Sequence, residues 1–67
     1  MTRKQSELLK YIKNYIKEKD YSPSFNEMKA AVNLKSKSGV HRLIEALEKH
    51  NKIKRVKFSH RSIEPIS

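Results

Sequence analysis

Polar and apolar side chains separate at helical spacing in residues 36–47, and this stretch holds the side chains best suited to recognition chemistry. At about 100° per residue, one arc of a helix carries four apolar side chains, Val40, Leu43, Ile44 and Leu47. The opposite arc carries four polar ones, Ser38, His41, Arg42 and Glu45. A short hydroxyl near the start, followed by an imidazole and a guanidinium, suits a helix that enters the major groove of DNA N-terminus first.

Arg42 is the strongest candidate for reading a base. Its guanidinium can bond O6 and N7 of one guanine at the same time, which discriminates between bases by about 1–3 kcal/mol. The alternative is a surface arginine that pairs with Glu45 or Glu48 on the same helix. His41 can donate to a guanine acceptor or to a phosphate, and the alternative for it is an exposed, solubilising histidine.

Small residues, Ser36, Ser38 and Gly39, occupy the start of this helix. We expect the two serines to cap the helix, a role worth about 1 kcal/mol. A phosphate contact would be a second use of the same terminus, because backbone amides there favour an anion. Gly39 costs about 1 kcal/mol relative to alanine inside a helix, which close approach to a duplex or packing against the preceding helix would explain. The predicted base-reading residues are Ser36, Ser38, Gly39, His41 and Arg42.

The formal net charge of +9 on 67 residues points to an anionic partner. Acidic residues are absent between Glu27 and Glu45 and again between Glu48 and Glu64, so two basic zones flank the predicted helix. Such zones are typical of a phosphate-contacting surface, and a solvated surface is the simpler alternative. Arg61 could also enter the minor groove. The predicted contacts to the DNA backbone are Lys35, Lys37, Lys52, Lys54, Arg55, Lys57 and Arg61.

The sequence offers little for catalysis, metal binding or membrane insertion. It has no cysteine, no paired-carboxylate cluster, no glycine-rich phosphate loop and no nucleophile elbow. Its three histidines lack the i, i+4 spacing of a helical zinc pair. No apolar run approaches the roughly 18 residues that span a bilayer. We therefore expect a soluble cytoplasmic protein that is not an enzyme and uses no cofactor, metal, membrane or small-molecule substrate.

Three helices must position these side chains. Capping-box spacing at residues 2–5 and 24–27 predicts helices that run to about residue 19 and about residue 32. A third helix should span residues 36–50, with Asn33 and Asn51 in the left-handed conformation that ends a helix. The buried side of the second helix is expected to be Phe25, Met28, Ala31 and Val32.

Beyond Asn51 the apolar period changes from helical to alternating. The spacing predicts two short strands around a polar turn, built on Ile53, Val56, Phe58, Ile63 and Ile66. Pro65 should mark an edge strand and its end. The predicted fold is mainly α with a small β-hairpin: a winged helix-turn-helix of three helices and a two-stranded wing, forming one domain over residues 1–67.

Five short segments, as a set, carry a family resemblance: residues 2–5, 21–24, 34–36, 38–44 and 61–63. Residues 2–5 are similar to an opening Thr-x-x-Gln, and residues 21–24 to a Pro-[Ser/Thr] segment that links two helices. Residues 34–36 are similar to the turn before a DNA-reading helix, and residues 38–44 to the base-contacting positions of that helix. Residues 61–63 are similar to an Arg-Gly-Ile on the second strand of the wing. In this combination the chain resembles the N-terminal DNA-binding domain of the LexA repressors, which control the bacterial DNA-damage (SOS) response.

The resemblance implies base or groove contacts from Ser36, Ser38, Gly39, His41 and Arg42, and phosphate contacts from the helix start and the wing. Asn51 and Ser62 stand where the family usually has glycine. LexA repressors also carry a second domain with a serine–lysine self-cleaving site and the main dimer contacts. Because this sequence ends at Ser67, we expect a stand-alone domain that does not cleave itself.

The hypothesis is a small LexA-like transcriptional regulator or repressor, bacterial or from a phage and associated with the nucleoid. The third helix (residues 36–50) would lie in the major groove of double-stranded operator DNA, and the wing (residues 53–66) would touch the backbone. Two copies on neighbouring half-sites would form a weak homodimer. The alternative is a basic winged-helix module that binds an acidic protein, as an inhibitor or anti-repressor. Membrane-surface binding through the first helix is a weaker third option.

Overall fold

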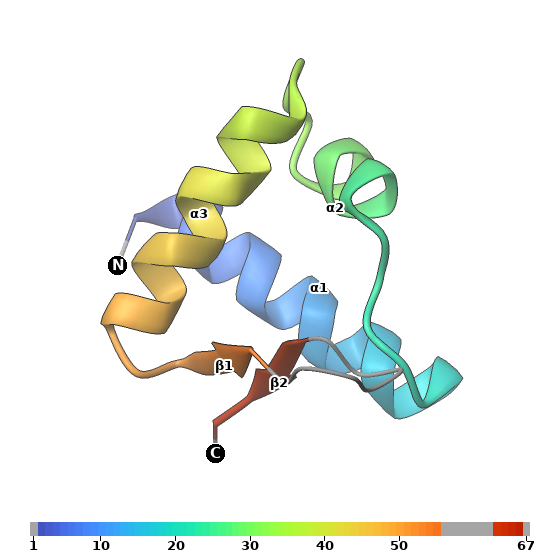
Figure 1. The fold of residues 1–67 in the computed structure, drawn as a ribbon. Helices are drawn as coiled ribbons and strands as arrows, with labels where there is room; N and C mark the ends of the chain where they lie inside the picture. The colour runs from blue at the N-terminus through green and yellow to red at the C-terminus, as the bar shows by residue number, and fades with distance from the viewer. Residues whose placement is uncertain (1, 56–62, 67) are drawn as a thin grey trace.

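The computed structural model describes residues 2–55 and 63–66, which form three helices followed by a two-stranded antiparallel sheet (Figure 1). The helices are α1 (Arg3–Lys19), α2 (Phe25–Ala31) and α3 (Lys37–Lys49). The strands are β1 (Ile53–Arg55) and β2 (Ile63–Pro65), paired in the register Ile53↔Pro65, Lys54↔Glu64 and Arg55↔Ile63. The predicted winged helix-turn-helix is confirmed, and β2 ends at the proline, as expected. Ile66, predicted on this strand, instead lies beyond it and is exposed, and the predicted strand residues Val56 and Phe58 lie outside the described residues.

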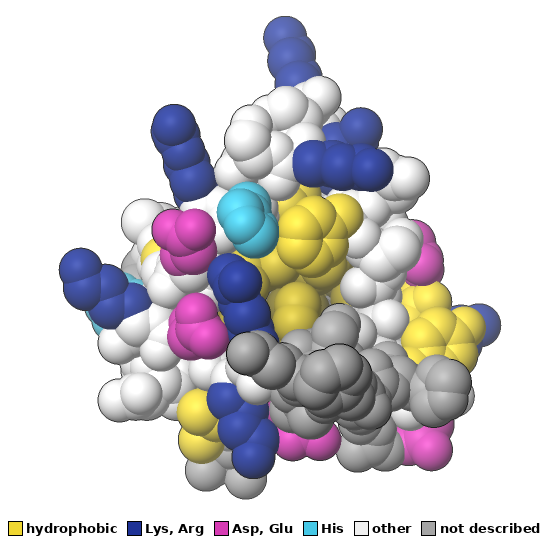
Figure 2. All heavy atoms as spheres, viewed as in Figure 1, with side chains coloured by type: hydrophobic (Ala, Val, Ile, Leu, Met, Phe, Trp, Pro, Cys, Tyr) yellow, Lys and Arg dark blue, Asp and Glu magenta, His cyan; other side chains and the backbone are white. Residues whose placement is uncertain are grey.

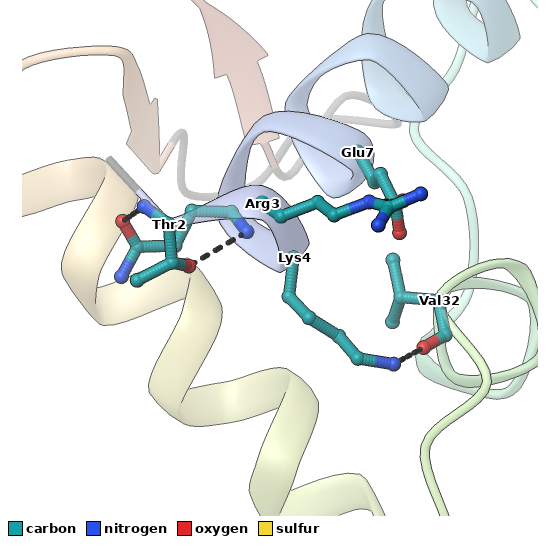
Figure 3. Close-up of polar contacts among 6 residues, drawn as sticks. Thr2, Arg3, Lys4, Glu7 and Val32 are labelled. Atoms are coloured by element: carbon teal, nitrogen blue, oxygen red, sulfur yellow. Dashed lines mark hydrogen bonds and ion pairs between the residues drawn. The ribbon is translucent and has the colours of Figure 1, made fainter.

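The first two helices begin in the capping boxes that the sequence predicts. At α1, the Gln5 amide donates to Thr2 Oγ1 at 3.2 Å, and the Thr2 amide donates to Gln5 Oε1 at 3.1 Å (Figure 3). At α2, the Glu27 amide donates to Ser24 Oγ at 3.2 Å, and the Ser24 amide donates to Glu27 Oε1 at 3.4 Å. Both pairs satisfy backbone amides that a helix start otherwise leaves without partners.

Asparagine ends two of the helices in the left-handed conformation, with φ of 55° at Asn33 and 59° at Asn51. After α3, the Asn51 amide donates to the Glu48 carbonyl at 3.0 Å and the Lys52 amide donates to the Leu47 carbonyl at 2.9 Å. The same pair of bonds closes α2. This is the Schellman arrangement, in which glycine is the usual left-handed residue, and the prediction for both asparagines is confirmed.

A single cluster of buried apolar side chains joins every element of the fold: Leu8, Leu9, Ile12, Met28, Val32, Val40, Ile44, Leu47, Ile53 and Ile63. The stripe predicted for α3 lies in this core, because Val40, Ile44 and Leu47 are buried and Leu43 is partly buried against them. Ile53 of β1 and Ile63 of β2 pack in this core and thereby join the wing to the helices. The opposite side of α3 is consequently turned away from the core.

The buried side of α2 differs in one position from the sequence expectation. Met28 and Val32 are buried and Phe25 is partly buried, but Ala31 is exposed. The prediction for Ala31 is wrong, because it is the last residue of α2 and faces solvent, whereas the prediction for Val32, the C-cap, is confirmed.

A lysine from α1 holds the end of α2 in place. Lys4 Nζ donates to the carbonyl of Val32, the C-cap of α2 (Figure 3). A cation favours this end of a helix, where carbonyl groups lack partners within the helix and the helix dipole is negative. The neighbouring Arg3 instead pairs with Glu7 on its own helix, with 3.3 Å between Nε and Oε1. Lys4 thus fixes the first helix of the helix-turn-helix relative to α1.

Candidate nucleic-acid interface

The five predicted base-reading residues lie together at the start of α3. Ser36 is the N-cap, Ser38 and Gly39 follow in the first turn, and His41 and Arg42 come next. All are exposed except Gly39, which is partly exposed. The core lies on the other side of the helix, since α3 packs on α1, α2 and β1. The exposed rim of α3 is therefore free to meet another molecule.

The hydroxyl of Ser36 does not cap α3, which corrects the expected role of the two serines. Ser36 has the extended backbone of an N-cap, but its side chain makes no capping hydrogen bond. Its Oγ lies 3.0 Å from Ser38 Oγ instead. Without that side-chain acceptor, the first amides of α3 remain suited to an anion such as a phosphate.

Arg42 makes no ion pair among residues 2–55 and 63–66. The alternative prediction was that Arg42 pairs with Glu45 or Glu48. Glu48 instead pairs with Arg55 of β1, with 3.6 Å between Oε1 and Nε. Glu45 forms no ion pair with the described residues either. The guanidinium of Arg42 is thus exposed and available for recognition.

His41 packs against the ring of Phe25, a residue that the sequence analysis predicted only as part of the core. The ring centroids of Phe25 and His41 are 5.7 Å apart and their planes are inclined at 51°. Phe25 comes from α2 and is partly buried, so it belongs both to the core edge and to this surface. Spacing along the sequence gave no signal for this contact, because it joins two different helices.

Packing within the turn gives a reason for glycine at position 39. A Cβ added there would lie 3.2 Å from Leu34 Cδ1, closer than ordinary van der Waals contact. Leu34 lies in the turn between α2 and α3 and packs on the core. Packing was one of the two explanations for Gly39, although the partner is in the turn rather than in the preceding helix.

The described wing cations lie on two different faces of the sheet. Lys54 Nζ is 3.6 Å from Glu64 Oε2 on the neighbouring strand, whereas Arg55 pairs with Glu48 of α3. Successive side chains of a strand alternate between faces, so Arg55 shares the side of α3 and Lys54 points the other way. Lys52 precedes the strand and is exposed. The predicted contacts Lys57 and Arg61 lie outside the described residues.

The acidic residues on the exposed side of α3 are confined to its second half, where they are followed by Lys49 in the last turn. Lys35 and Lys37 are exposed just before and at the first residue of the helix, and the acidic residues Glu45 and Glu48 follow in its second half. Figure 2 shows a hydrophobic patch with a histidine at its edge, basic side chains above it and at its lower left, and acidic side chains beside the histidine. A polyanion would be attracted more to the beginning of α3, which lacks acidic residues, than to its later turns.

A second polar cluster joins α1 to the start of α2, away from the rim of α3. A hydrogen bond from the Tyr15 hydroxyl lowers the pKa of the Glu27 carboxyl below its ordinary 4.5. The same bond, with a second one involving Tyr21, raises the pKa of Tyr15. Tyr15 and Tyr21 also pack edge-on, with ring centroids 5.6 Å apart. This cluster orients the capping box of α2 and offers no reactive group.

No group of three or more His, Cys, Asp or Glu side chains in the described part of the chain could hold a metal ion. The same residues enclose no pocket for a small molecule. In residues 2–55 and 63–66, no helix combines the length and the apolar character needed to cross a bilayer. The arrangement on α3 is an exposed surface that carries charged and polar side chains.

Comparison with known proteins agrees with this surface. Residues 1–62 match the family described as the LexA DNA binding domain. The chain is 53% identical over 66 residues to the LexA repressor of Granulibacter bethesdensis. It is 52% identical over 64 residues to that of Gluconacetobacter diazotrophicus and 53% identical over 64 residues to that of Acidiphilium cryptum.

These alignments cover 98%, 96% and 96% of this chain, but only 27%, 25% and 28% of the three relatives. The chain thus spans about a quarter of the length of the curated relatives it matches. The family match runs from the capping box of α1 to the residue before β2. On this match, the chain belongs to the LexA DNA-binding domain family.

Proposed function

We propose that the protein binds double-stranded DNA in a sequence-specific manner, with α3 in the major groove and the wing on the adjacent backbone. One observation carries the proposal: the apolar stripe of α3 is buried, while His41 and Arg42 are exposed near its start and Arg42 has no ion-pair partner among the described residues. A guanidinium in that state can bond a guanine bidentately.

The absence of acidic residues from the first half of α3 supports an N-terminus-first orientation. The beginning of the helix brings lysines, unbonded amides and the two reading side chains toward the duplex. The later turns bring Glu45 and Glu48, which phosphates repel. In this orientation Ser36, Ser38 and Gly39 come closest to the groove, and their small side chains permit the approach.

The phosphate contacts in this arrangement come from both sides of α3: Lys35, Lys37, Lys52, Lys54, Arg55, Lys57 and Arg61. Among the described ones, Arg55 shares the side of α3 and Lys54 does not, so Arg55 contributes more to the same duplex. A single module of this size should bury roughly 600–1,000 Å² of its surface on DNA. That area favours modest affinity for one copy, and two copies on neighbouring half-sites form a weak homodimer on the DNA.

At the level of the cell, we propose a non-enzymatic transcriptional regulator that acts in the cytoplasm at the nucleoid. Relatives named LexA repressor share its family, and its reading surface would suit operators that such repressors use. It would act as a repressor in its own right or compete with a longer repressor for the same sites. Footprinting at a DNA-damage promoter, with and without a full-length repressor, separates the two roles.

Selection from a random duplex library tests the binding proposal. The wild-type protein should enrich a defined site, and Arg42→Ala should lose preference at one base position while retaining weak binding. Uniform weakening across sequences would make Arg42 a phosphate contact instead. Equal binding to the selected and a scrambled duplex would overturn the proposal and leave the alternative of an acidic protein partner.

A further inference from the structure

The imidazole of His41 packs against another aromatic ring and is also exposed to solvent. Its ring lies 5.7 Å from that of Phe25, centroid to centroid, at an inclination of 51°, within the range in which aromatic pairs attract each other. His41 is nevertheless exposed. We infer that Phe25 is a positioning residue that sets base specificity, by holding His41 in the orientation from which it reads the groove. The inference rests on the proposed function.

Phe25 is itself firmly placed. It is the first residue of α2 and directly follows Ser24, whose capping box with Glu27 fixes the backbone at this point through two hydrogen bonds. The ring packs partly against the core, and the preceding Pro23 is buried. Local hydrogen bonds and core packing thus make Phe25 a rigid support for a side chain on the other helix.

A support of this kind matters because hydrogen-bond readout depends on narrow distances and angles. An exposed histidine without a neighbour would exchange between rotamers, and immobilising one such side chain on binding lowers affinity by about two- to tenfold. Phe25 removes part of this cost before the duplex arrives. The benefit applies only when the base under His41 is the correct one, so it acts on discrimination at one position.

The experiment compares Phe25→Leu with Phe25→Tyr. The leucine keeps an apolar side chain and removes the ring, whereas the tyrosine keeps the ring. Asn26→Ala is the control, because it changes an exposed side chain in the same turn of α2 and leaves the capping box and the Phe25 ring in place. Each protein is titrated with the duplex selected by the wild type and with every single-base variant of it, below the melting temperature of the least stable protein.

His41→Ala first identifies the base position that depends on the imidazole. At that position Phe25→Leu should reduce discrimination by about two- to tenfold, and Phe25→Tyr and Asn26→Ala should leave it unchanged. In the His41→Ala background, Phe25→Leu should have no further effect there. Nuclear Overhauser contacts between the two rings in the DNA-free protein should be present in the wild type and retained in Phe25→Tyr.

Two results overturn the inference while leaving the proposed function in place. One is a Phe25→Leu profile that is weakened equally at all positions, which would make Phe25 a structural residue only. The other is a loss of discrimination on Phe25→Leu that is as large in the His41→Ala background as in the wild type. If the wild type itself selects no sequence, both the proposed function and the inference fail.

Discussion

Glu48 on α3 and Arg55 on β1 form an ion pair, with 3.6 Å between Oε1 and Nε, and this pair connects the proposed reading helix to the wing. Both side chains remain partly exposed, with 44% and 41% of their surface accessible, so the pair contributes little stability. Its effect is electrostatic: Glu48 competes with a DNA phosphate for Arg55, and adds a negative charge beside the proposed DNA surface.

Glu48→Gln should therefore strengthen non-specific DNA binding. With Glu48 no longer competing for Arg55, the slope of log K against log salt should steepen by up to about 0.9, and stability should change by less than about 1 kcal/mol. The measurement is a series of fluorescence titrations on a random duplex between low and moderate salt. Glu64→Gln, which frees Lys54 on the other face of the wing, is the control and should change the slope less. An equal gain from both variants would contradict the facial arrangement.

Asn51 should respond to substitution according to its left-handed backbone. Asn51→Ala should lower the free energy of unfolding by about 1 kcal/mol, because a Cβ is disfavoured at a φ of 59°. Asn51→Gly should leave it unchanged or raise it slightly, as glycine is the usual residue in this motif. The matched control is Asn14→Ala, an exposed residue within α1, which should stabilise by up to about 0.7 kcal/mol through helix propensity. Urea unfolding measures the stability of all three variants. An equal loss of stability in Asn14→Ala and Asn51→Ala would contradict the argument from the left-handed backbone.

Lys4 should contribute stability that another lysine on the same helix does not. Lys4→Met removes the ammonium that bonds the Val32 carbonyl and should reduce the free energy of unfolding by about 1 kcal/mol, since the bond is charge-assisted but partly exposed. Lys10→Met, an exposed substitution on α1, is the control and should have an effect near zero. Identical thermal unfolding curves for the two variants would show that the bond does not anchor α2.

Local features of the fold were predictable from the sequence because their partners lie within a few residues. The capping boxes at residues 2–5 and 24–27 join positions three apart, and asparagine tolerates the left-handed backbone at positions 33 and 51. The buried stripe of α3 follows from the apolar spacing alone. The sequence did not single out Asp20, which takes the same conformation after α1 with a φ of 66°.

Contacts between elements were not predictable in this way. The alternative partner for Arg42 was taken from its own helix, but Glu48 pairs with Arg55, and only the pairing of β1 with β2 beside α3 brings that arginine near. Phe25 and His41 meet for a similar reason, since the turn between α2 and α3 sets their separation. Ser36 has a residue type that favours capping, and its hydroxyl nevertheless faces Ser38, because a cap also requires the right side-chain rotamer.

Gly39→Ala separates the two reasons for glycine at this position. The added methyl group would lie 3.2 Å from the end of the Leu34 side chain, which is only partly buried and can yield by a few tenths of an ångström. Helix propensity favours alanine by up to about 1 kcal/mol, so the melting temperature should stay the same or rise slightly. Affinity for the selected duplex should fall if Gly39 approaches the groove. A loss of more than about 1 kcal/mol of stability would make packing the dominant reason.

Glu27 should make stability depend on pH in the acidic range. Because the Tyr15 hydroxyl lowers the pKa of this carboxyl in the folded protein, the charged form is stabilised by folding. The contribution is complete above the unfolded value of about 4.5 and is lost as the pH falls through the lowered folded value. Glu27→Gln keeps a capping-box residue but does not titrate. Urea unfolding from pH 7 to pH 3 should show the wild type more stable at neutral pH and the two proteins converging in acid. Glu45→Gln, at an exposed site outside the capping boxes, serves as the control, and curves for Glu27→Gln that stay parallel to the wild type would refute the role of the Tyr15 bond.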